Sequence, residues 1–370
     1  MVLFDLIARE IHQRGPIPFV EFMHHALYAP DLGYYSAGIK TLGLDGDFVT
    51  APELTPLFGQ TLALQCCQVL KELESPILFE FGAGTGRLCV DLLTKLEHLD
   101  SLPHEYHILE VSASLAHQQQ VLINRIIPHL AKKVRWLSAW PSTPITGVVV
   151  ANEVLDAMPI HRFCQTEVDL FESHIKLNSH NELEEIYLPS TDERLKTYLQ
   201  NKLPKESFPY QSEANLFMDG WFQQCYDMLD CGAMIILDYG FPRHEYYHSS
   251  RNQGTLMCHY RHRAHTNPLL YLGMQDITAH VDFTHVAEAA HQAGFDVAGF
   301  TNLGSFLLAN GLLSLIPTID DELKRINTLQ RVRQLIEPHQ MGELFKVMLL
   351  SKKIDLPWQG FQLDDKRASL

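Results

Sequence analysis

Short apolar runs separated by longer helical stretches make up most of the chain after residue 76. Such runs are typical of buried strands, and the stretches between them show the spacing of helices. The expected strands are Ile77–Phe81, Tyr106–Val111, Val134–Leu137, Val148–Ala151 and Ala233–Asp238, with later candidates at Val297–Thr301 and Phe345–Ser351. Strands alternating with helices predict an α/β fold, in which a mainly parallel sheet carries helices on both faces.

The first 75 residues show a different pattern. Pro56–Leu73 has apolar positions three and four residues apart, which predicts an amphipathic helix, and residues 1–19 show similar helical spacing. Between these helices, residues 28–54 are rich in Gly, Pro, Tyr and Asp and predict an irregular segment. Because long irregular segments in compact proteins are often functional, we expect this one to fold over a ligand.

Pro159–Leu229 separates the fourth and fifth predicted strands and is too long for one crossover. Its first part, residues 161–188, predicts an antiparallel ribbon with a turn at Asn178–Asn181. The chain therefore divides into a helical, ligand-covering N-terminal segment (1–75), the first part of the core (76–158), an inserted β-rich and helical subdomain (159–229), the second part of the core with a substrate loop (230–352) and a C-terminal tail (353–370).

Composition and charge narrow the class of protein. Hydrophobic residues form 46% of the 370 residues and charged residues 20%, which is ordinary for a globular protein. No apolar run approaches the roughly 20 residues of a membrane helix, so we expect no membrane insertion. The formal net charge is −15, with 44 acidic against 29 basic residues. This charge argues against a nucleic-acid partner and favours a basic one, although a local basic groove in an acidic whole stays open.

The N-terminus and the cysteines bear on location. The first 19 residues include Asp5 and Glu10, so they resemble neither a signal peptide nor an acid-poor transit peptide. The seven cysteines form no C-x-x-C pair, and Cys66 and Cys67 are adjacent in a helical stretch. We therefore expect buried, reduced thiols and a cytoplasmic location.

The stretch "ILFEFGAGTGRL" places three glycines between a predicted strand and a predicted helix. A dinucleotide fingerprint would need its third glycine where Arg87 stands, and no Gly-Lys-Ser/Thr follows as in a phosphate-binding loop. The pattern is E-x-G-x-G-x-G from residue 80, in which the glycines let the backbone approach a ligand and the acid can engage a cation. S-adenosylmethionine has the ammonium, carboxylate and ribose that suit this layout. The expected cofactor-binding residues are Glu80, Gly82, Ala83, Gly84 and Gly86.

The second strand supports the same ligand. It ends at Glu110, 24 residues after Gly86, where an acid can accept hydrogen bonds from both ribose hydroxyls. Val111 and Ser112 follow and are expected to line the same site. The acid alone does not distinguish an S-adenosylmethionine site from an NAD site. The spacing of the glycines does. The alternative is a tight strand-to-helix turn beside an ordinary surface glutamate.

Several blocks outside the glycine loop are unusual. They include "GPIPFVEFMHHALYAPDLGYYS", "GDFVTAPELTPLFGQ", "EFGAGTGRL", "ANEVLDAMPIHRF", "LDYGFP", "GTLMCHYRHRAHTNPL", "DITAHVDFT" and "MGELFKVML". In content and order these blocks resemble the MidA family, from residue 15 to about residue 350. The resemblance implies a class I S-adenosylmethionine-dependent methyltransferase with a Rossmann-like sheet. It also implies methylation of an arginine in a protein partner, for which a respiratory complex subunit is one candidate, and a homodimer is one assembly that we consider.

Polar residues after the fourth strand are candidates for the acceptor site. Carboxylates that hold an arginine would pin its charge on the nitrogens that do not attack. Asn152, Glu153 and Asp156 follow this strand, beside the expected methyl group, and Glu153 is our first choice for catalysis. Asn152 is also expected to contact the cofactor, whereas Asn152 or Asp156 could instead cap a following helix.

Two further groups of residues are candidates with open alternatives. In "TAPE", Pro52 is expected at the cofactor, and Glu53 is either a substrate or cofactor carboxylate or an acid in the first turn of a helix. His280, in "DITAHVDF", could act as a base or bind substrate. A metal site involving His259 or His265 is not expected, because the spacing of metal ligands is not met.

Two other classes of function remain open. A nucleic-acid base methyltransferase typically shows Asn/Asp-Pro-Pro-aromatic after the fourth strand, where this chain has "NEVL". A methyltransferase that acts on a small molecule is a further alternative of this kind. A non-catalytic assembly factor could bind S-adenosylmethionine only as a structural ligand.

Overall fold

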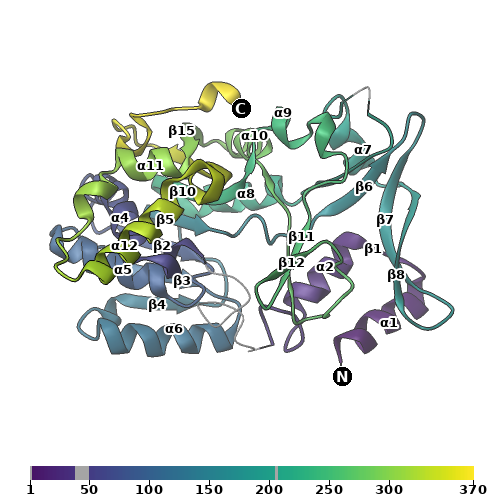
Figure 1. Ribbon diagram of the computed structural model, residues 1–370, viewed down its shortest axis with the longest axis horizontal. Coiled ribbons are helices and arrows are strands. Elements are labelled where there is room, and N and C mark those ends of the chain that lie inside the picture. The colour runs from purple at the N-terminus through teal and green to yellow at the C-terminus, as the bar shows by residue number, and fades with distance from the viewer. Residues whose placement is uncertain (1, 38–49, 205–206) are drawn as a thin grey trace.

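The protein is built around a large sheet with helices on both faces (Figure 1). The structure, a computed structural model, describes residues 2–37, 50–204 and 207–370. The main strands are β2 (Ile77–Phe81), β3 (Glu105–Leu109), β4 (Val134–Leu137), β5 (Ile145–Asn152), β10 (Leu229–Phe241), β15 (Asp296–Asn302) and β16 (Phe345–Lys352), with the short β14 (Val281–Asp282) beside β10. Their order across the sheet is β15-β16-β10-β5-β2-β3-β4.

Most neighbours in this sheet run parallel. The pairs β10–β5, β5–β2, β2–β3 and β3–β4 are parallel, whereas β16 is antiparallel to both β10 and β15. The predicted α/β fold with a mainly parallel sheet is confirmed. Because carboxyl ends of parallel strands lie at one edge of the sheet, the loops after β2, β3 and β5 meet there.

Both faces of the sheet are buried. Neighbouring residues of a strand point to opposite faces, so Val148 and Val150 pack in one core cluster and Val149 in the other. The first cluster takes side chains from α4 (Pro56–Leu70), α5 (Arg87–His98), α6 (Ala113–Ile126), α11 (Leu303–Ala309) and α12 (Glu322–Ile336). The second takes them from α8 (Met218–Met228) and α10 (Phe283–Ala293), for example Phe222 and Phe283.

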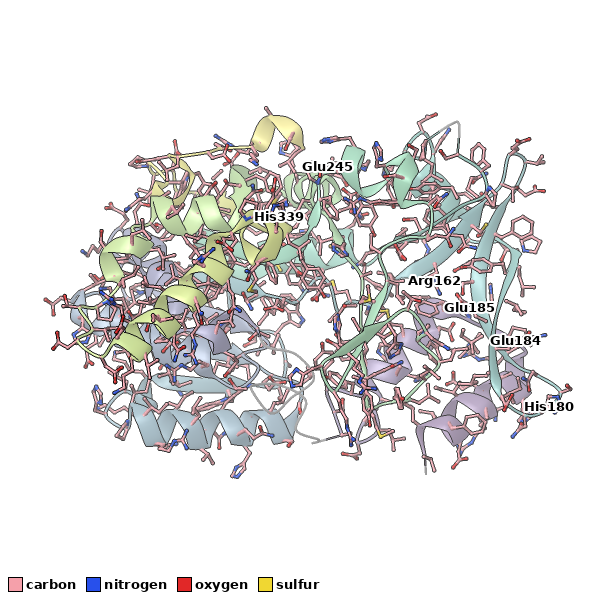
Figure 2. The ribbon with its side chains drawn as sticks, in the orientation of Figure 1. Arg162, His180, Glu184, Glu185, Glu245 and His339 are labelled. Carbon is pink, nitrogen blue, oxygen red and sulfur yellow. The ribbon has the colours of Figure 1, made fainter. Side chains whose placement is uncertain are left out.

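A second layer lies beside the large sheet, at the right of Figure 1. It contains α1 (Leu3–Arg14), α2 (Phe19–Tyr28) and the strands β1 (Ile17–Pro18), β6 (His161–Gln165), β7 (Leu170–Leu177), β8 (Leu183–Pro189) and β9 (Tyr210–Ala214). These strands form an antiparallel sheet in the order β1-β7-β6-β9, with β8 beside β7. Arg162 of β6 and Glu185 of β8 lie close together (Figure 2), with 2.5 Å between Nη1 and Oε1.

This second sheet joins parts of the chain that the sequence pattern treated separately. The predicted ribbon is present as β6 to β8, and its turn contains Asn181 at φ 60°. However, β1 from the N-terminal segment pairs with β7 of the insertion, with Ile17 opposite Ile175. The five segment boundaries stay a prediction.

The remaining elements are short. A small sheet has the order β12-β11-β13 and consists of β11 (Met257–Tyr260), β12 (Arg263–His265) and β13 (Asp276–Thr278). The short helices are α3 (Ala51–Leu54), α7 (Glu193–Leu199), α9 (Arg243–Tyr246), η1 (Ala131–Lys133), η2 (Ser249–Arg251), η3 (Leu312–Leu315), η4 (Pro338–Gly342), η5 (Gln359–Phe361) and η6 (Arg367–Ser369). Within the described residues, no helix is long and apolar enough to cross a membrane. The seven cysteines are free thiols, and five of them are buried.

Several predicted element ends differ from those in the structure. The second strand stops at Leu109, so that Glu110 starts a loop and donates its backbone N–H to Leu137 O at 3.1 Å. The fifth strand is longer than predicted and runs from Leu229 to Phe241 instead of from Ala233 to Asp238. No helix begins directly after Asn152, since the chain turns sharply there.

Candidate functional site

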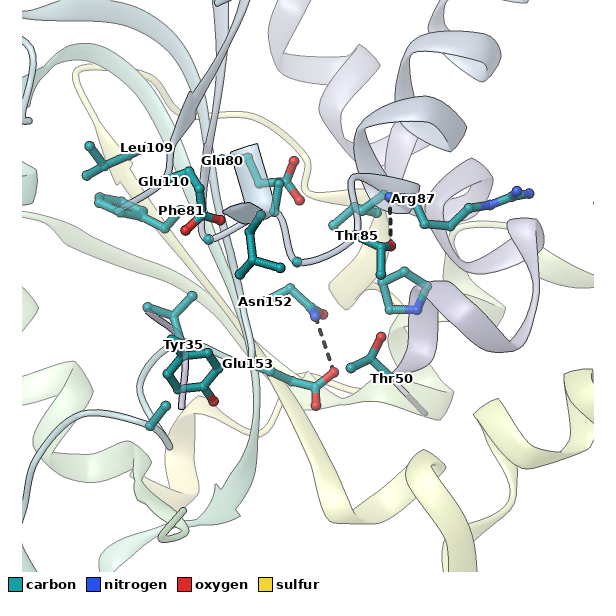
Figure 3. A pocket seen from close by; sticks show the side chains of 18 of the residues that line it. Tyr35, Thr50, Glu80, Phe81, Thr85, Arg87, Leu109, Glu110, Asn152 and Glu153 are labelled. Carbon is teal, nitrogen blue, oxygen red and sulfur yellow. Dashed lines mark hydrogen bonds between the residues drawn. The ribbon is translucent and has the colours of Figure 1, made fainter. Parts of the chain in front are cut away.

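A cleft of about 250 Å³ opens at the carboxyl ends of β2, β3 and β5. Figure 3 shows Leu109 and Glu110 near one end of it, Thr85 and Arg87 near the other, and Glu153 between Tyr35 and Thr50. The lining residues fall within 28–35, 50–53, 80–88, 109–115 and 152–157. Five separate segments therefore meet at one edge of the sheet, as expected for ligand binding in an open α/β fold.

The glycine loop forms one wall of the cleft. Gly82, Gly84 and Gly86 have φ values of 56°, 53° and 87°, a region that favours glycine. Gly82, Ala83 and Gly84 line the cleft, and a Cβ added at Gly82 would meet no atom within 4 Å. Gly86 instead caps α5, where an added Cβ would come within 3.3 Å of Gln119. The loop thus exposes backbone to a ligand at its first half and closes the turn at its second.

Glu110 lies at the end of the cleft nearest β3. Its Oε1 accepts the backbone N–H of Ser112 at 2.9 Å, and its Oε2 accepts Nε2 of Gln119 at 2.9 Å. Burial raises the pKa of this carboxyl, which these two donors oppose. Ser112 caps α6 and does not line the cleft, whereas Val111 lines it and is 70% exposed. Glu110 is therefore held in a fixed orientation by neighbours and retains accepting capacity toward the cleft.

Glu80 is part of the cleft floor. It is buried, and its Oε2 accepts the hydroxyl of Tyr106 at 2.6 Å. Burial raises the pKa of Glu80 to about 7. Its expected contact with a cationic group stays a prediction, and the hydrogen bond links the neighbouring strands β2 and β3.

Glu153 occupies the middle of the cleft in an unusual backbone conformation. Its φ is 52°, and its N–H donates to Leu237 O at 2.9 Å, which ties the turn to β10. A left-handed non-glycine residue costs of order 1–3 kcal/mol and often marks a functional site. Burial, and next the nearby Asp156, raise the pKa of Glu153 to about 8.

Asn152 beside it carries an unpaired acceptor. Its Nδ2 donates to Glu153 Oε1 at 3.3 Å, as Figure 3 shows, but its buried Oδ1 has no hydrogen-bond partner among the described residues. A buried acceptor left unpaired costs about 1–3 kcal/mol. Since Asn152 lines the cleft, a ligand N–H would satisfy this atom. The residues present thus fit a ligand that bears an ammonium group.

The described lining is acidic. It includes four carboxylates, namely Glu53, Glu80, Glu110 and Glu153. The one cationic side chain in this lining is Arg87, whose Nε donates to Asp91 at 3.1 Å. Glu53 lies in the first turn of α3 and accepts the hydroxyl of Thr85. Glu53 is thus a first-turn acid that also lines the cleft, and its role as a substrate or cofactor carboxylate stays a prediction. Such a cleft attracts cations.

Besides Gly86 and Ser112, two further candidate residues do not line the cleft. Asp156 is buried behind it, close to Asp238, which accepts the N–H of Leu155 at 2.9 Å. His280 stacks on Phe241 with ring centroids 5.2 Å apart, and burial lowers its pKa to about 4. The sequence placed both residues by loop position alone, which does not reveal the direction of a side chain. A direct role for His280 as a base in the cleft is not supported by this position.

Other lining residues were missed by the sequence analysis. Tyr28, Tyr35, Thr50, Thr85 and Arg87 line the cleft beside the expected Pro52. The composition of residues 28–54 was the available signal, but it did not single out individual side chains. Residues 38–49 of this segment lie outside the described residues. No group of three or more His, Cys, Asp or Glu among the described residues could hold a metal ion.

Comparisons with known proteins agree with this geometry. Residues 61–301 match a family model described as "Putative S-adenosyl-L-methionine-dependent methyltransferase". Two crystal structures from Burkholderia thailandensis are 40% identical and cover 100% of this chain and 96% of their own. Their TM-scores are 0.95 and 0.92, and the first is bound to S-adenosyl-homocysteine.

Curated relatives are more distant. The mitochondrial protein arginine methyltransferase NDUFAF7 of Danio rerio is 27% identical over 368 residues, 92% of this chain and 84% of the relative. Its Drosophila melanogaster homologue is 27% identical over 376 residues, with 92% and 83% covered. Both relatives are mitochondrial, which contradicts the expected cytoplasmic location, and that expectation is wrong. Free thiols indicate a reducing environment and do not distinguish one reducing compartment from another.

Proposed function

Because this chain belongs to the family of S-adenosyl-L-methionine-dependent methyltransferases, we propose that it transfers the methyl group to an arginine side chain of a partner protein. The family, the class I fold, the cofactor and the enzymatic class expected from the sequence are confirmed. The arginine acceptor is our proposal. The observation that carries it is the acidic cleft, with the Glu153 carboxyl in its middle.

We propose that the chain's own residues hold the cofactor as follows. Glu110 accepts from the ribose hydroxyls, the backbone of residues 82–84 contacts the amino-acid part, and Asn152 Oδ1 accepts from the ammonium. S-adenosyl-L-methionine supplies a methyl group on a positively charged sulfur, which leaves as a neutral thioether. Negative side chains around the cleft stabilise this bound cation before transfer.

On the acceptor side, we assign Glu153 the central role. A guanidinium always carries its charge in water and offers five N–H donors. Glu153, with Glu53 as a second carboxylate of the same cleft, would pin that charge on two nitrogens and leave the third more nucleophilic. The new bond forms at this nitrogen, whose extra proton must then leave. Glu153 can take it, since the pKa of this carboxyl lies near 8 in the ligand-free cleft.

Lysine is a poorer acceptor for the same cleft. A surrounding set of carboxylates raises the pKa of an amine and keeps it as an ammonium without a lone pair. A guanidinium keeps nucleophilic character on one nitrogen even while it is charged. The relatives named protein arginine methyltransferases support the same choice. A respiratory complex subunit as the partner, and a homodimer as the assembly, remain finer proposals that rest on the MidA resemblance.

The test is labelled methyl transfer into a cell lysate, with the label separated into protein and nucleic acid. We expect label in protein, and acid hydrolysis to release it as methylated arginine. Glu153→Gln should remove most of this label while binding S-adenosylhomocysteine as tightly as the unmodified protein does. Label in nucleic acid or in small molecules would redirect the proposal, and no transfer at all would favour a non-catalytic assembly factor.

A further inference from the structure

Two tyrosines form an aromatic wall in the cleft. Tyr28 is the last residue of α2, and Tyr35 follows in the turn behind it. Their rings are stacked, with centroids 5.6 Å apart and 25° between the planes. Both are only partly buried and both line the cleft, and Tyr35 lies beside Glu153 in Figure 3.

The hydroxyl groups of both tyrosines are already engaged away from the cleft. Tyr28 donates to the backbone oxygen of Ala157 at 2.9 Å, and Tyr35 donates to Oδ1 of Asp276 at 2.9 Å. Asp276 is buried, so the Tyr35 ring is fixed from behind. What the pair offers to a ligand is therefore aromatic carbon, in a pocket whose other described walls carry carboxylates.

We propose that the stacked rings of Tyr28 and Tyr35 form the surface on which the acceptor guanidinium lies, and that Tyr35 decides arginine over lysine. This assignment takes the proposed arginine methylation as its premise and adds the residue that selects the acceptor. A guanidinium is planar and weakly hydrated, so it stacks on an aromatic face while its edge meets a carboxylate. Tyr35 and Glu153 line the same cleft and supply one of each.

Lysine cannot use this pair of contacts equally well. Its ammonium is a compact, strongly hydrated charge without a plane, and loses more solvation on an aromatic surface. The proposed cofactor contacts are Glu110, the glycine loop and Asn152, whereas the hydroxyl of Tyr35 bonds to Asp276, so loss of the Tyr35 ring should leave cofactor binding intact.

The variants isolate the ring from its hydrogen bond. Tyr35→Phe removes the bond to Asp276 but keeps the ring, whereas Tyr35→Leu removes both. Tyr271→Leu is the matched control, because Tyr271 stacks on Tyr260 with centroids 4.0 Å apart but does not line the cleft. Each protein, saturated with S-adenosylhomocysteine, is titrated with Nα-acetyl-arginine amide and with Nα-acetyl-lysine amide.

We expect the unmodified protein, Tyr35→Phe and Tyr271→Leu to prefer the arginine compound. Tyr35→Leu should lose about 2- to 30-fold in affinity for it, with little change for the lysine compound and unchanged affinity for S-adenosylhomocysteine. An unmodified protein without arginine preference, or Tyr35→Leu with full preference, would refute the assignment. Equal loss of S-adenosylhomocysteine binding would refute it as well. Failure of the proposed function is seen separately, as labelled methyl that is absent from arginine in the lysate.

Discussion

Replacing Glu153 by Gln should make methyl transfer less dependent on pH as well as slower. The carboxyl lies in the middle of the cleft, and its pKa is raised to about 8 by desolvation and by Asp156. At pH 7 it is therefore mostly protonated before the acceptor arrives. Gln keeps the size and the accepting oxygen and removes only the charge that the ionised form would supply.

The magnitude follows from two opposing terms. A hydrogen bond to a charged group contributes roughly 1.5–3 kcal/mol. Ionising a carboxyl with a pKa one unit above the working pH costs about 1.4 kcal/mol. At pH 7 the variant should therefore lose at most about tenfold in transfer rate, whereas at pH 9 the loss should reach about ten- to hundredfold.

The measurement is single-turnover transfer to a native protein substrate between pH 6 and 9, beside calorimetry with S-adenosylhomocysteine. The unmodified enzyme should gain rate with rising pH up to about 8, since the ionised form then dominates. The variant should show a flatter profile with unchanged cofactor affinity. Equal rates for the two proteins at pH 9 would remove Glu153 from the acceptor site, and an equal loss of cofactor affinity would reassign it to the cofactor.

Three further predictions concern the cofactor site and stability. Gly84→Val should abolish S-adenosylhomocysteine binding in a folded protein, because φ is 53° there and a branched side chain opposes it; calorimetry with unchanged affinity would move the site elsewhere. NAD should stabilise the protein less than S-adenosylhomocysteine does in a thermal shift, since Arg87 replaces the third dinucleotide glycine. Stability should fall as pH rises from about 4.5 to 8, because the raised pKa values of Glu80 and Glu153 mean that the folded state holds protons that the unfolded state releases. Urea unfolding at pH 5 and pH 8 checks this. The free energy of unfolding should fall by at most about 1.4 kcal/mol per group and pH unit. Glu153→Gln should make it depend less steeply on pH.

The cleft wall formed by the glycine loop and Glu110 could be predicted from the sequence, because each part directly follows a strand of the parallel sheet. Gly82 and Gly84 follow their strand directly, and the left-handed backbone that they adopt is one that glycine supplies. Glu110 ends the neighbouring parallel strand, so the topology alone brings it to the same edge. Local pattern and sheet direction were sufficient here.

The cleft wall formed by Tyr28 and Tyr35 could not be predicted in this way. Tyr35 and Asp276 are 241 positions apart in the chain, and Tyr28 and Ala157 are 129 apart. No periodicity reports such pairings, because they depend on how the second sheet packs against the first. His280 shows the converse, since its loop position suggested a base or a substrate contact, whereas its ring stacks on Phe241 and does not line the cleft.

The charge of the protein shows how sequence composition and three-dimensional structure complement each other. The net charge of −15 suggested a basic partner, but a global count does not say where a cation would bind. The cleft gathers Glu53, Glu110 and Glu153 from three separate segments, while Arg87 is turned to Asp91 within α5. The same negative field serves both a sulfonium and a guanidinium, so charge alone cannot select the acceptor. Shape must do that, and among the described lining residues the flat surface beside Glu153 is the ring of Tyr35.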